Sequence, residues 1–131
     1  MAPPKLLFVC VHNAGRSQMA AAFARRLGGC SIEAYSAGSR PAAAIHPMVV
    51  EAMRERGIPL RGRPKGVADL PSGPFDVMVT MGCGDVCPTI PAARRVDWAI
   101  PDPAGRPLDI VRVIRDQVEQ QVRALLQTLN R

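Results

Sequence analysis

Cys10 and Arg16, with Ser17 directly after the arginine, are the residues in this sequence whose types and spacing most clearly suggest chemistry. They form a Cys-x5-Arg-Ser loop that lies between an apolar stretch and a helical one. A thiol at such a position lies beside the free N–H groups and the positive end of a helix, which favours the thiolate over the thiol. The guanidinium can bind two oxygens of a tetrahedral oxyanion, and the Ser17 hydroxyl can donate to the sulfur. The loop therefore predicts a nucleophilic cysteine in an oxyanion-binding site.

The residues between the cysteine and the serine suit the backbone of such a site. Asn13 and Gly15 tolerate positive φ angles, which a tight nest of N–H groups requires. The alternative is a buried structural cysteine beside a surface arginine, since cysteine is a common small core residue. On the first interpretation the oxyanion is bound by Val11, His12, Asn13, Ala14, Gly15 and Arg16.

Two further cysteines, Cys83 and Cys87, lie four positions apart in a loop rich in glycine. In an extended chain their Cα atoms would be about 13 Å apart, whereas a disulfide requires roughly 4.4–6.8 Å. One helical turn would bring them to about 6 Å, so a redox role requires this loop to coil. Zinc binding and a pair of structural thiols remain alternatives, although no second cysteine pair completes a zinc site. We expect no bound metal.

Asp102 lies between Pro101 and Pro103, in a segment whose prolines exclude regular structure. A carboxylic acid held near the anion could protonate a departing oxygen. Taken alone, the residue is equally well explained as a turn-forming aspartate.

The elements that must position these residues alternate between strand and helix. Such alternation indicates a parallel sheet, whose ligands bind beyond the carboxyl ends of the strands. Cys10, Cys83 and Asp102 each follow a predicted strand and can therefore meet there. The fold class is α/β, a three-layer α/β/α arrangement with a four-stranded parallel sheet. The predicted strands are residues 5–9, which are continuously apolar as in a central strand, 30–36, 75–80 and 94–98. The predicted helices are 17–27, which Gly28-Gly29 ends, a second from His46-Pro47 to Gly57, a single turn at 67–70, and 108–129. Residues spaced by three and four predict one buried apolar stripe on the last helix: Ile110, Ile114, Val118, Val122, Leu125 and Leu129.

Size and composition set the limits of these assignments. The 131 residues suffice for one domain, 1–131, whose core must be aliphatic because 47% of the residues are hydrophobic but only 4% are aromatic. The net charge of +6 comes from scattered basic residues, which favours small anions over nucleic acid. We expect a cytoplasmic monomer without a membrane segment, in which cysteines are reactive or metal-binding rather than disulfide-bonded. Cys30 is assigned to packing, and His46 to a helix start.

Three features in this order resemble the low-molecular-weight tyrosine phosphatase fold family, and more closely the arsenate reductases built on that fold. They are the loop from Cys10 to Ser17, the cysteine-bearing loop at 81–88, and the Asp102-Pro103 pair before the last helix. The resemblance covers nearly the whole chain. It implies an oxidoreductase of arsenic detoxification that converts arsenate to arsenite.

The resemblance also implies a role for each site residue. The Cys10 thiolate attacks arsenate held by Arg16 while Asp102 protonates the departing hydroxyl. Cys83 then attacks the Cys10 sulfur, and Cys87 resolves the resulting disulfide. This redox-active pair is reduced by an external thiol, either thioredoxin or a mycothiol and glutaredoxin-like system, and no cofactor is bound.

The sequence departs from the family at a few positions. The spacing of Cys83 and Cys87 is narrower than in familiar members. Asn13 and Ser36 match a potassium site found in some relatives, but Ala21 and Lys65 replace its acids, so no potassium ion is predicted.

Two other functions remain open. A tyrosine phosphatase would use Cys10, Arg16 and Asp102 alone, although the loop after Asp102 offers no aromatic rim for a phenyl ring. A sensor protein would bind oxyanions or arsenite through its thiols without turnover.

Overall fold

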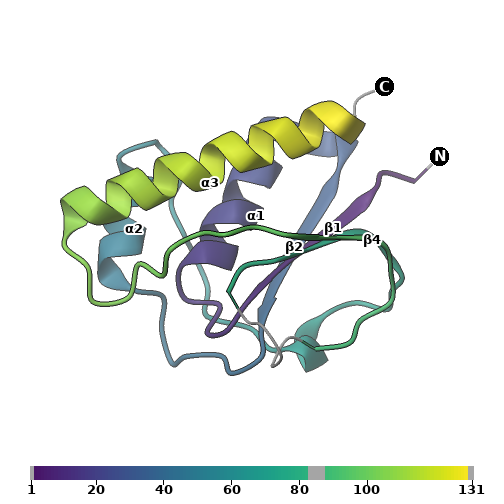
Figure 1. The fold of residues 1–131 in the computed structure, drawn as a ribbon, viewed down its shortest axis with the longest axis horizontal. Helices are drawn as coiled ribbons and strands as arrows, with labels where there is room; N and C mark the ends of the chain where they lie inside the picture. Colours follow the sequence, from purple (N-terminus) through teal and green to yellow (C-terminus); the bar gives the residue numbers. More distant parts are fainter. Residues whose placement is uncertain (1, 83–87, 130–131) are drawn as a thin grey trace.

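A four-stranded parallel sheet forms the centre of the molecule, in the strand order β2-β1-β3-β4 (Figure 1). The computed structural model describes residues 2–82 and 88–129. The strands are β1 (Lys5–Cys10), β2 (Glu33–Gly38), β3 (Phe75–Thr80) and β4 (Ala92–Asp97), and the α-helices are α1 (Arg16–Gly28), α2 (Pro47–Arg54) and α3 (Leu108–Leu129). The predicted α/β class and parallel sheet are confirmed.

Strand β1 is an inner strand because nearly all of its side chains are apolar. Leu6 to Cys10 are buried, as expected for a strand covered on both faces. It pairs with β2 on one side, where Cys10 lies opposite Gly38, and with β3 on the other. Cys10 is therefore at the carboxyl end of an inner strand, as predicted.

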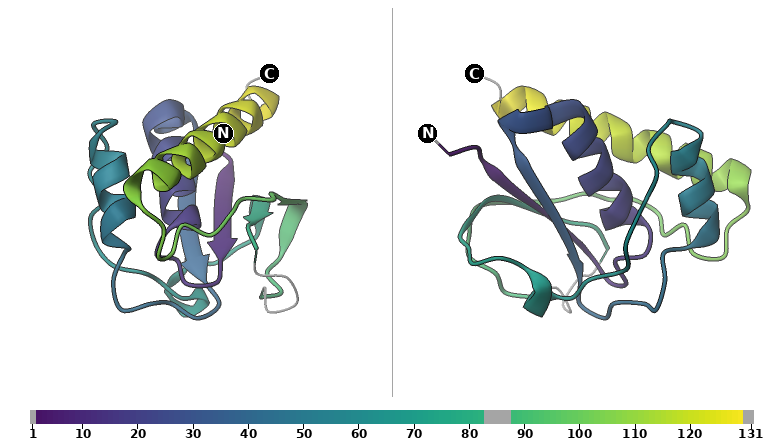
Figure 2. Two further views of the ribbon diagram at one scale, coloured as in Figure 1. Left: turned by 60° about the vertical axis from the view of Figure 1, so that its left-hand side comes forward. Right: turned by 180° about the vertical axis from the view of Figure 1, so that it is seen from behind.

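The two faces of the sheet are covered differently (Figure 2). All three α-helices pack on one face, in a core that includes Phe8, Phe23, Met53 and Val118. On the other face a smaller cluster around Leu7 is covered by partly buried side chains from loops and strand ends. In the described part of the chain, the second helical layer of the expected α/β/α arrangement therefore contains no α-helix.

Helix α3 runs across the first two helices and buries the predicted apolar stripe. Val111, Ile114, Val118, Val122 and Leu125 are buried at spacings of three and four residues. Ile110 and Leu129, which were also assigned to the stripe, are exposed and half-buried respectively. The stripe is thus narrower at the two ends of the helix than predicted.

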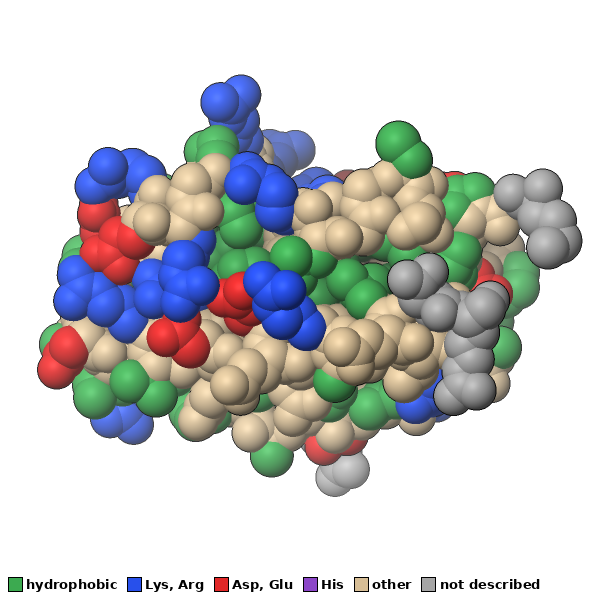
Figure 3. All heavy atoms as spheres, turned by 90° about the horizontal axis from the view of Figure 1, so that it is seen from above, with side chains coloured by type: hydrophobic (Ala, Val, Ile, Leu, Met, Phe, Trp, Pro, Cys, Tyr) green, Lys and Arg blue, Asp and Glu red, His purple; other side chains and the backbone are tan. Residues whose placement is uncertain are grey.

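A network of ion pairs joins the end of α2 to α3, on the face where Figure 3 shows basic and acidic side chains interspersed. Arg112 and Arg115 both donate to Glu55, at 2.6 and 2.9 Å. Arg56 donates to Asp116 and Glu119. The hydrogen bonds from Arg112, followed by the smaller effect of Arg115, lower the pKa of Glu55 to about 2.

The region after α1 differs from the prediction. A 3₁₀ turn, η1 (Gly29–Ser31), follows the helix, and β2 begins only at Glu33 rather than at residue 30. The turn is favoured by the positive φ of Gly29 and by the Ser31 hydroxyl, which donates to the Gly28 carbonyl at 2.5 Å. Cys30 is therefore exposed, and its assignment to core packing was wrong.

The remaining boundaries are close to those predicted. The helix expected from His46 does begin there, with Val49 and Val50 donating to the His46 carbonyl, and Gly57 follows its end with φ +71°. The expected turn at 67–70 is the 3₁₀ helix η2 (Val67–Asp69). Strand β4 starts two residues earlier than predicted and ends before Trp98, whose ring packs 5.8 Å from Phe8.

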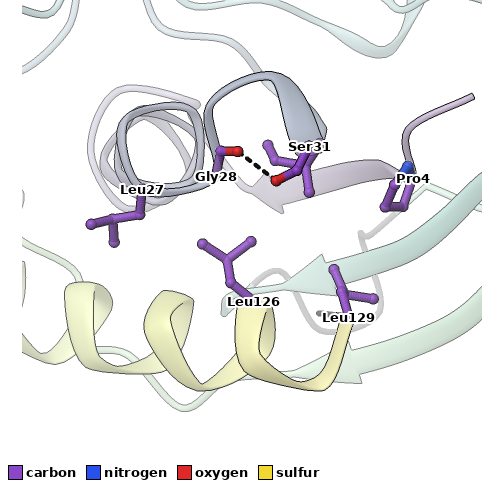
Figure 4. A pocket seen from close by; sticks show the side chains of 7 residues that line it. Pro4, Leu27, Gly28, Ser31, Leu126 and Leu129 are labelled. Atoms are coloured by element: carbon purple, nitrogen blue, oxygen red, sulfur yellow. Dashed lines mark hydrogen bonds between the residues drawn. The ribbon is translucent and has the colours of Figure 1, made fainter. Parts of the chain in front are cut away.

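A small cavity of about 110 Å³ lies between α3 and the end of α1 (Figure 4). Leu27, Leu126 and Leu129 are grouped around it. Pro4 precedes β1, so the cavity is at the amino end of the sheet, opposite Cys10. Among the described helices, none is long and apolar enough to cross a membrane.

Candidate active site

Cys10 lies at the start of a chain of buried hydrogen bonds. Its Sγ is 2.9 Å from the Ser17 hydroxyl, and that hydroxyl accepts a hydrogen bond from the Asn13 amide at 2.7 Å. Because the serine oxygen already accepts from Asn13, its own proton is free to point at the sulfur. The arrangement is suited to stabilising a thiolate, as the sequence predicted.

The orientation of Asn13 is fixed by two donors on its other side. Its Oδ1 accepts from the Gln18 side chain at 2.9 Å and from the Lys65 backbone N–H at 2.7 Å. An amide whose oxygen accepts two N–H groups must direct its own NH₂ the opposite way, toward Ser17. Asn13 also has φ +50°, the left-handed conformation that the sequence predicted for this loop.

The loop at 10–17, called the anion loop below, has its carbonyl groups bonded to a neighbouring segment. Those of Cys10, Val11, His12 and Ala14 accept N–H groups from the segment at 39–46, at 2.8–3.3 Å. Within the described residues, no backbone or side-chain acceptor takes the N–H groups of His12 to Ser17. Helix α1 likewise begins without a side-chain cap or an acidic residue in its first turn. N–H groups that have no acceptor in the protein can bind an oxyanion next to the thiol.

Arg16 links this loop to the loop that carries Asp102. Its Nη1 donates to the Ile100 carbonyl at 3.1 Å, and its Nη2 lies 3.7 Å from Asp102 Oδ2. The arginine is buried, whereas the Asp102 side chain is half exposed. The other carboxylate oxygen accepts from the Ala104 N–H at 3.0 Å, so the acid is fixed at the mouth of the site.

Glycines allow three segments to approach closely around the anion loop. A Cβ atom on Gly15 would lie 2.7 Å from the Pro103 ring, and one on Gly38 would lie 2.7 Å from the Val11 carbonyl oxygen. A Cβ atom on Gly82 would lie 2.3 Å from Arg16 Nη1. The chain leaving β3 therefore passes over the guanidinium immediately before Cys83.

The structure thus brings most of the predicted site together. Cys10, Arg16, Ser17 and Asp102 share one edge of the sheet, and the loop residues from Val11 to Gly15 surround them. The His12 ring is turned toward the neighbouring segment, where its Nδ1 bonds the Arg40 carbonyl at 3.1 Å. Cys83 and Cys87 lie outside the described residues.

Sequence reasoning missed Gln18, Gly82 and the carbonyl of Ile100. The available signal for Gln18 was a polar residue directly after Ser17, on a stretch of helix that is otherwise small and apolar. Gly82 could have been recognised as a glycine that directly precedes Cys83, a predicted site residue. The Ile100 carbonyl gives no signal in the sequence, because any residue supplies one. Across the described ranges, no three His, Cys, Asp or Glu side chains gather as metal ligands would.

Comparison with known proteins places this site in a family. The sequence profile described as "Low molecular weight phosphotyrosine protein phosphatase" matches residues 5–131. A putative arsenate reductase of Halobacterium salinarum is 41% identical over 132 residues, which cover 96% of this chain and 93% of that relative. A glutaredoxin arsenate reductase of Synechocystis is 33% identical, over 93% of this chain and 95% of the relative.

A solved structure of similar fold agrees with these relatives. The thioredoxin-dependent arsenate reductase of Corynebacterium glutamicum superposes with a TM-score of 0.79 and 38% sequence identity. The match covers 96% of this chain and 61% of the Corynebacterium chain. The chain therefore belongs to the low molecular weight phosphotyrosine protein phosphatase family, and within it is similar to arsenate reductases over nearly its whole length.

Proposed function

We propose that this protein is an arsenate reductase that converts arsenate to arsenite through a relay of its own cysteines. The observation that supports this most strongly is the position of Cys10, with its sulfur 2.9 Å from Ser17 Oγ at the edge of a loop of uncommitted N–H groups. The similarity to relatives named arsenate reductase supports arsenate as the oxyanion.

Arsenate binds in this proposal with its oxygens on the loop N–H groups of residues 11–16 and on the Arg16 guanidinium. The guanidinium is already held by Ile100, so little side-chain freedom is lost when the anion binds. The helix N-terminus adds a positive field at the same place. Val11, His12, Asn13, Ala14 and Gly15 contribute through the backbone rather than through their side chains.

The first chemical step forms a bond between the Cys10 sulfur and arsenic, and one As–O bond breaks. Asp102 gives its proton to the departing oxygen, which leaves as water. Ser17 donates to the sulfur before the attack.

The second step reduces arsenic and requires a second thiol. The Cys83 thiolate attacks the Cys10 sulfur, an S–S bond forms, and the electron pair of the S–As bond stays on arsenic. Arsenic(V) thereby becomes arsenic(III), and arsenite leaves. Cys87 then attacks Cys83, which frees Cys10 as a thiolate and leaves a Cys83–Cys87 disulfide.

An external thiol reductant must return the Cys83–Cys87 disulfide to two thiols. Relatives are named for thioredoxin and for glutaredoxin, so either thioredoxin or a glutaredoxin-like system with a low-molecular-weight thiol is the proposed partner. We further propose that residues 1–131 act as one domain and as a monomer in the reducing cytoplasm, without a bound cofactor or metal.

Tyrosine phosphatase activity is a second candidate, because the matching family profile carries that name. Cys10, Arg16 and Asp102 would suffice for it, since phosphorus is not reduced and water can complete the cycle. The loop after Asp102 consists of Pro103, Ala104 and Gly105, which offer no aromatic surface for a phenyl ring. Slow hydrolysis of a small aryl phosphate is therefore compatible with the reductase.

The test is arsenate-dependent oxidation of NADPH in the presence of thioredoxin and thioredoxin reductase, repeated with a glutaredoxin-like donor. We expect the wild-type protein to be active and Cys83→Ser to lose the activity. Cys30→Ser is the matched control, because Cys30 is exposed and outside the site, and its activity should be unchanged.

Aryl phosphate hydrolysis by the same variants separates the candidates. The relay predicts that Cys83→Ser still hydrolyses the phosphate ester while Cys10→Ser does not. Arsenate reduction that survives in Cys83→Ser would contradict the relay. Phosphatase turnover without any arsenate reduction would favour the phosphatase, and binding without turnover of either substrate would favour the sensor.

A further inference from the structure

A second concave site lies on the other side of Asn13 from the reactive cysteine. It is a cavity of about 410 Å³ between α1 and the basic segment that follows α2. Gln18 is on its wall, and Ile58 and Leu60 supply apolar surface. Its volume is in the range of sites that hold small molecules, roughly 300–1,000 Å³.

Four cationic side chains line this cavity: Arg25, Arg26, Arg61 and Lys65. None of them forms an ion pair with a carboxylate of the described residues. On the α2–α3 face, by contrast, each arginine that joins the two helices is paired with Asp or Glu. The cavity therefore carries a concentrated positive charge that the described chain does not neutralise.

Two of the four cations are held in place by the backbone. Arg25 donates from Nε and Nη2 to the Ala34 carbonyl at 3.1 and 2.9 Å. Arg26 donates from Nη2 to the Gly57 carbonyl at 2.8 Å. Burial lowers the pKa of Arg25, the effect expected where a cation loses water without gaining a counter-ion. An anion would supply that counter-ion to donors already in position.

We propose that this cavity binds a small polyanion, a molecule that carries two or more neighbouring phosphate or carboxylate groups. One monovalent oxyanion would leave most of the four charges unmatched, whereas adjacent anionic groups can pair with several of them at once. The apolar surface of Ile58 and Leu60 beside the cations suits an organic portion of the same molecule. The site is distinct from the anion loop, from which it is separated by the Gln18–Asn13 hydrogen bond.

The experiment is isothermal titration calorimetry of the 131-residue protein with inorganic tripolyphosphate at low ionic strength. The double variant Arg61→Gln/Lys65→Gln removes the two cations that have no side-chain hydrogen bond within the described structure. We expect it to bind at least tenfold more weakly than wild type. Arg63→Gln/Arg94→Gln is the matched control, since it loses the same charge at exposed positions outside the cavity, and its affinity should stay within about twofold.

A third variant separates the cavity from the anion loop. Arg16→Gln weakens the anion loop only, so tripolyphosphate binding at the cavity should stay within about twofold of wild type. Equal weakening in the two double variants would overturn the proposal, because net charge would then account for it. So would loss of binding in Arg16→Gln with retention in Arg61→Gln/Lys65→Gln, or no binding to the wild-type protein.

Discussion

Gly82 lies directly against the guanidinium of Arg16. A Cβ atom at this glycine would come within 2.3 Å of Nη1, a distance that real side chains do not reach. Its φ of +77° also belongs to the left-handed region. A side chain at residue 82 would therefore have to displace the Arg16 guanidinium.

Gly82→Ala should displace the arginine and impair arsenate binding. We expect kcat/KM for arsenate to fall by about tenfold or more, because small displacements of a positioning group are costly. Gly105→Ala is the matched control, since it has φ +71° but no atom within 4 Å of an added Cβ. Both variants bear a backbone strain of about 1–2 kcal/mol, so a similar loss of activity in both would show that the contact with Arg16 is unimportant.

The Ser17 hydroxyl should determine how readily Cys10 reacts at neutral pH. Ser17→Ala removes the 2.9 Å contact with the sulfur, a hydrogen bond to a charged group that is worth roughly 1.5–3 kcal/mol. Alkylation of Cys10 by iodoacetamide should therefore slow by about tenfold or more at pH 7. An unchanged rate would mean that the Ser17 hydroxyl does not stabilise the reactive form of the sulfur.

Gln18 should affect the reactivity of the Cys10 sulfur indirectly, through Asn13 and Ser17. Gln18→Glu replaces the donor to Asn13 Oδ1 with a carboxylate, which repels that oxygen and favours rotation of the amide. Ser17 would then lose the bond from Asn13, and alkylation of Cys10 at pH 7 should slow as it does in Ser17→Ala. Gln121→Glu makes the identical change at an exposed position of α3 and should leave the alkylation rate as in wild type. If Cys10 is alkylated at the same rate in Gln18→Glu and Gln121→Glu, the hydrogen bonds through Asn13 and Ser17 do not carry the influence of Gln18 to the sulfur.

The bonds between Glu55 and α3 predict a pH dependence of stability. The folded protein holds the pKa of Glu55 at about 2, below its ordinary value of 4.5, so the ionised group stabilises the fold above pH 4.5. This contribution should be lost progressively as the pH falls from 4.5 toward 2. Glu55→Gln should therefore have a lower Tm than wild type at pH 7, and the difference should narrow as the pH decreases over that window.

Glu51→Gln is the control for this measurement, because Glu51 bonds Arg54 within α2 and does not join the helices. Its Tm should differ little from that of wild type at any pH. A Glu55→Gln difference that stays constant from pH 7 to pH 3 would show that the pairing with Arg112 does not stabilise the fold.

The parts of the fold that the sequence predicted well are those fixed by local pattern. Continuous apolar residues before Cys10 predicted an inner strand, and apolar spacing of three and four predicted α3. Gly28 and Gly29 were taken as a simple helix stop, but Ser31 bonds back to Gly28 and extends the turn. The local pattern at residues 30–32 does not reveal this bond. The predicted start of β2 was therefore too early, and Cys30 was wrongly assigned to packing.

The site could be predicted only as far as its contacts are local. Cys10, Arg16 and Ser17 lie within one loop, and their grouping followed from spacing. The Lys65 N–H that holds Asn13 comes from 52 residues away, and the Ile100 carbonyl that holds Arg16 from 84 residues away. Such contacts depend on how loops fold back over the sheet, which residue type does not encode.

In the proposed relay, the Cys10 sulfur receives the oxidation from arsenic and passes it to Cys83. The direct measurement is peptide mapping by mass spectrometry after Cys87→Ser protein is mixed with one equivalent of arsenate without external thiol. We expect a Cys10–Cys83 disulfide formed together with one arsenite per protein. Arsenite formed without that disulfide, or a disulfide that includes Cys30 instead, would contradict it.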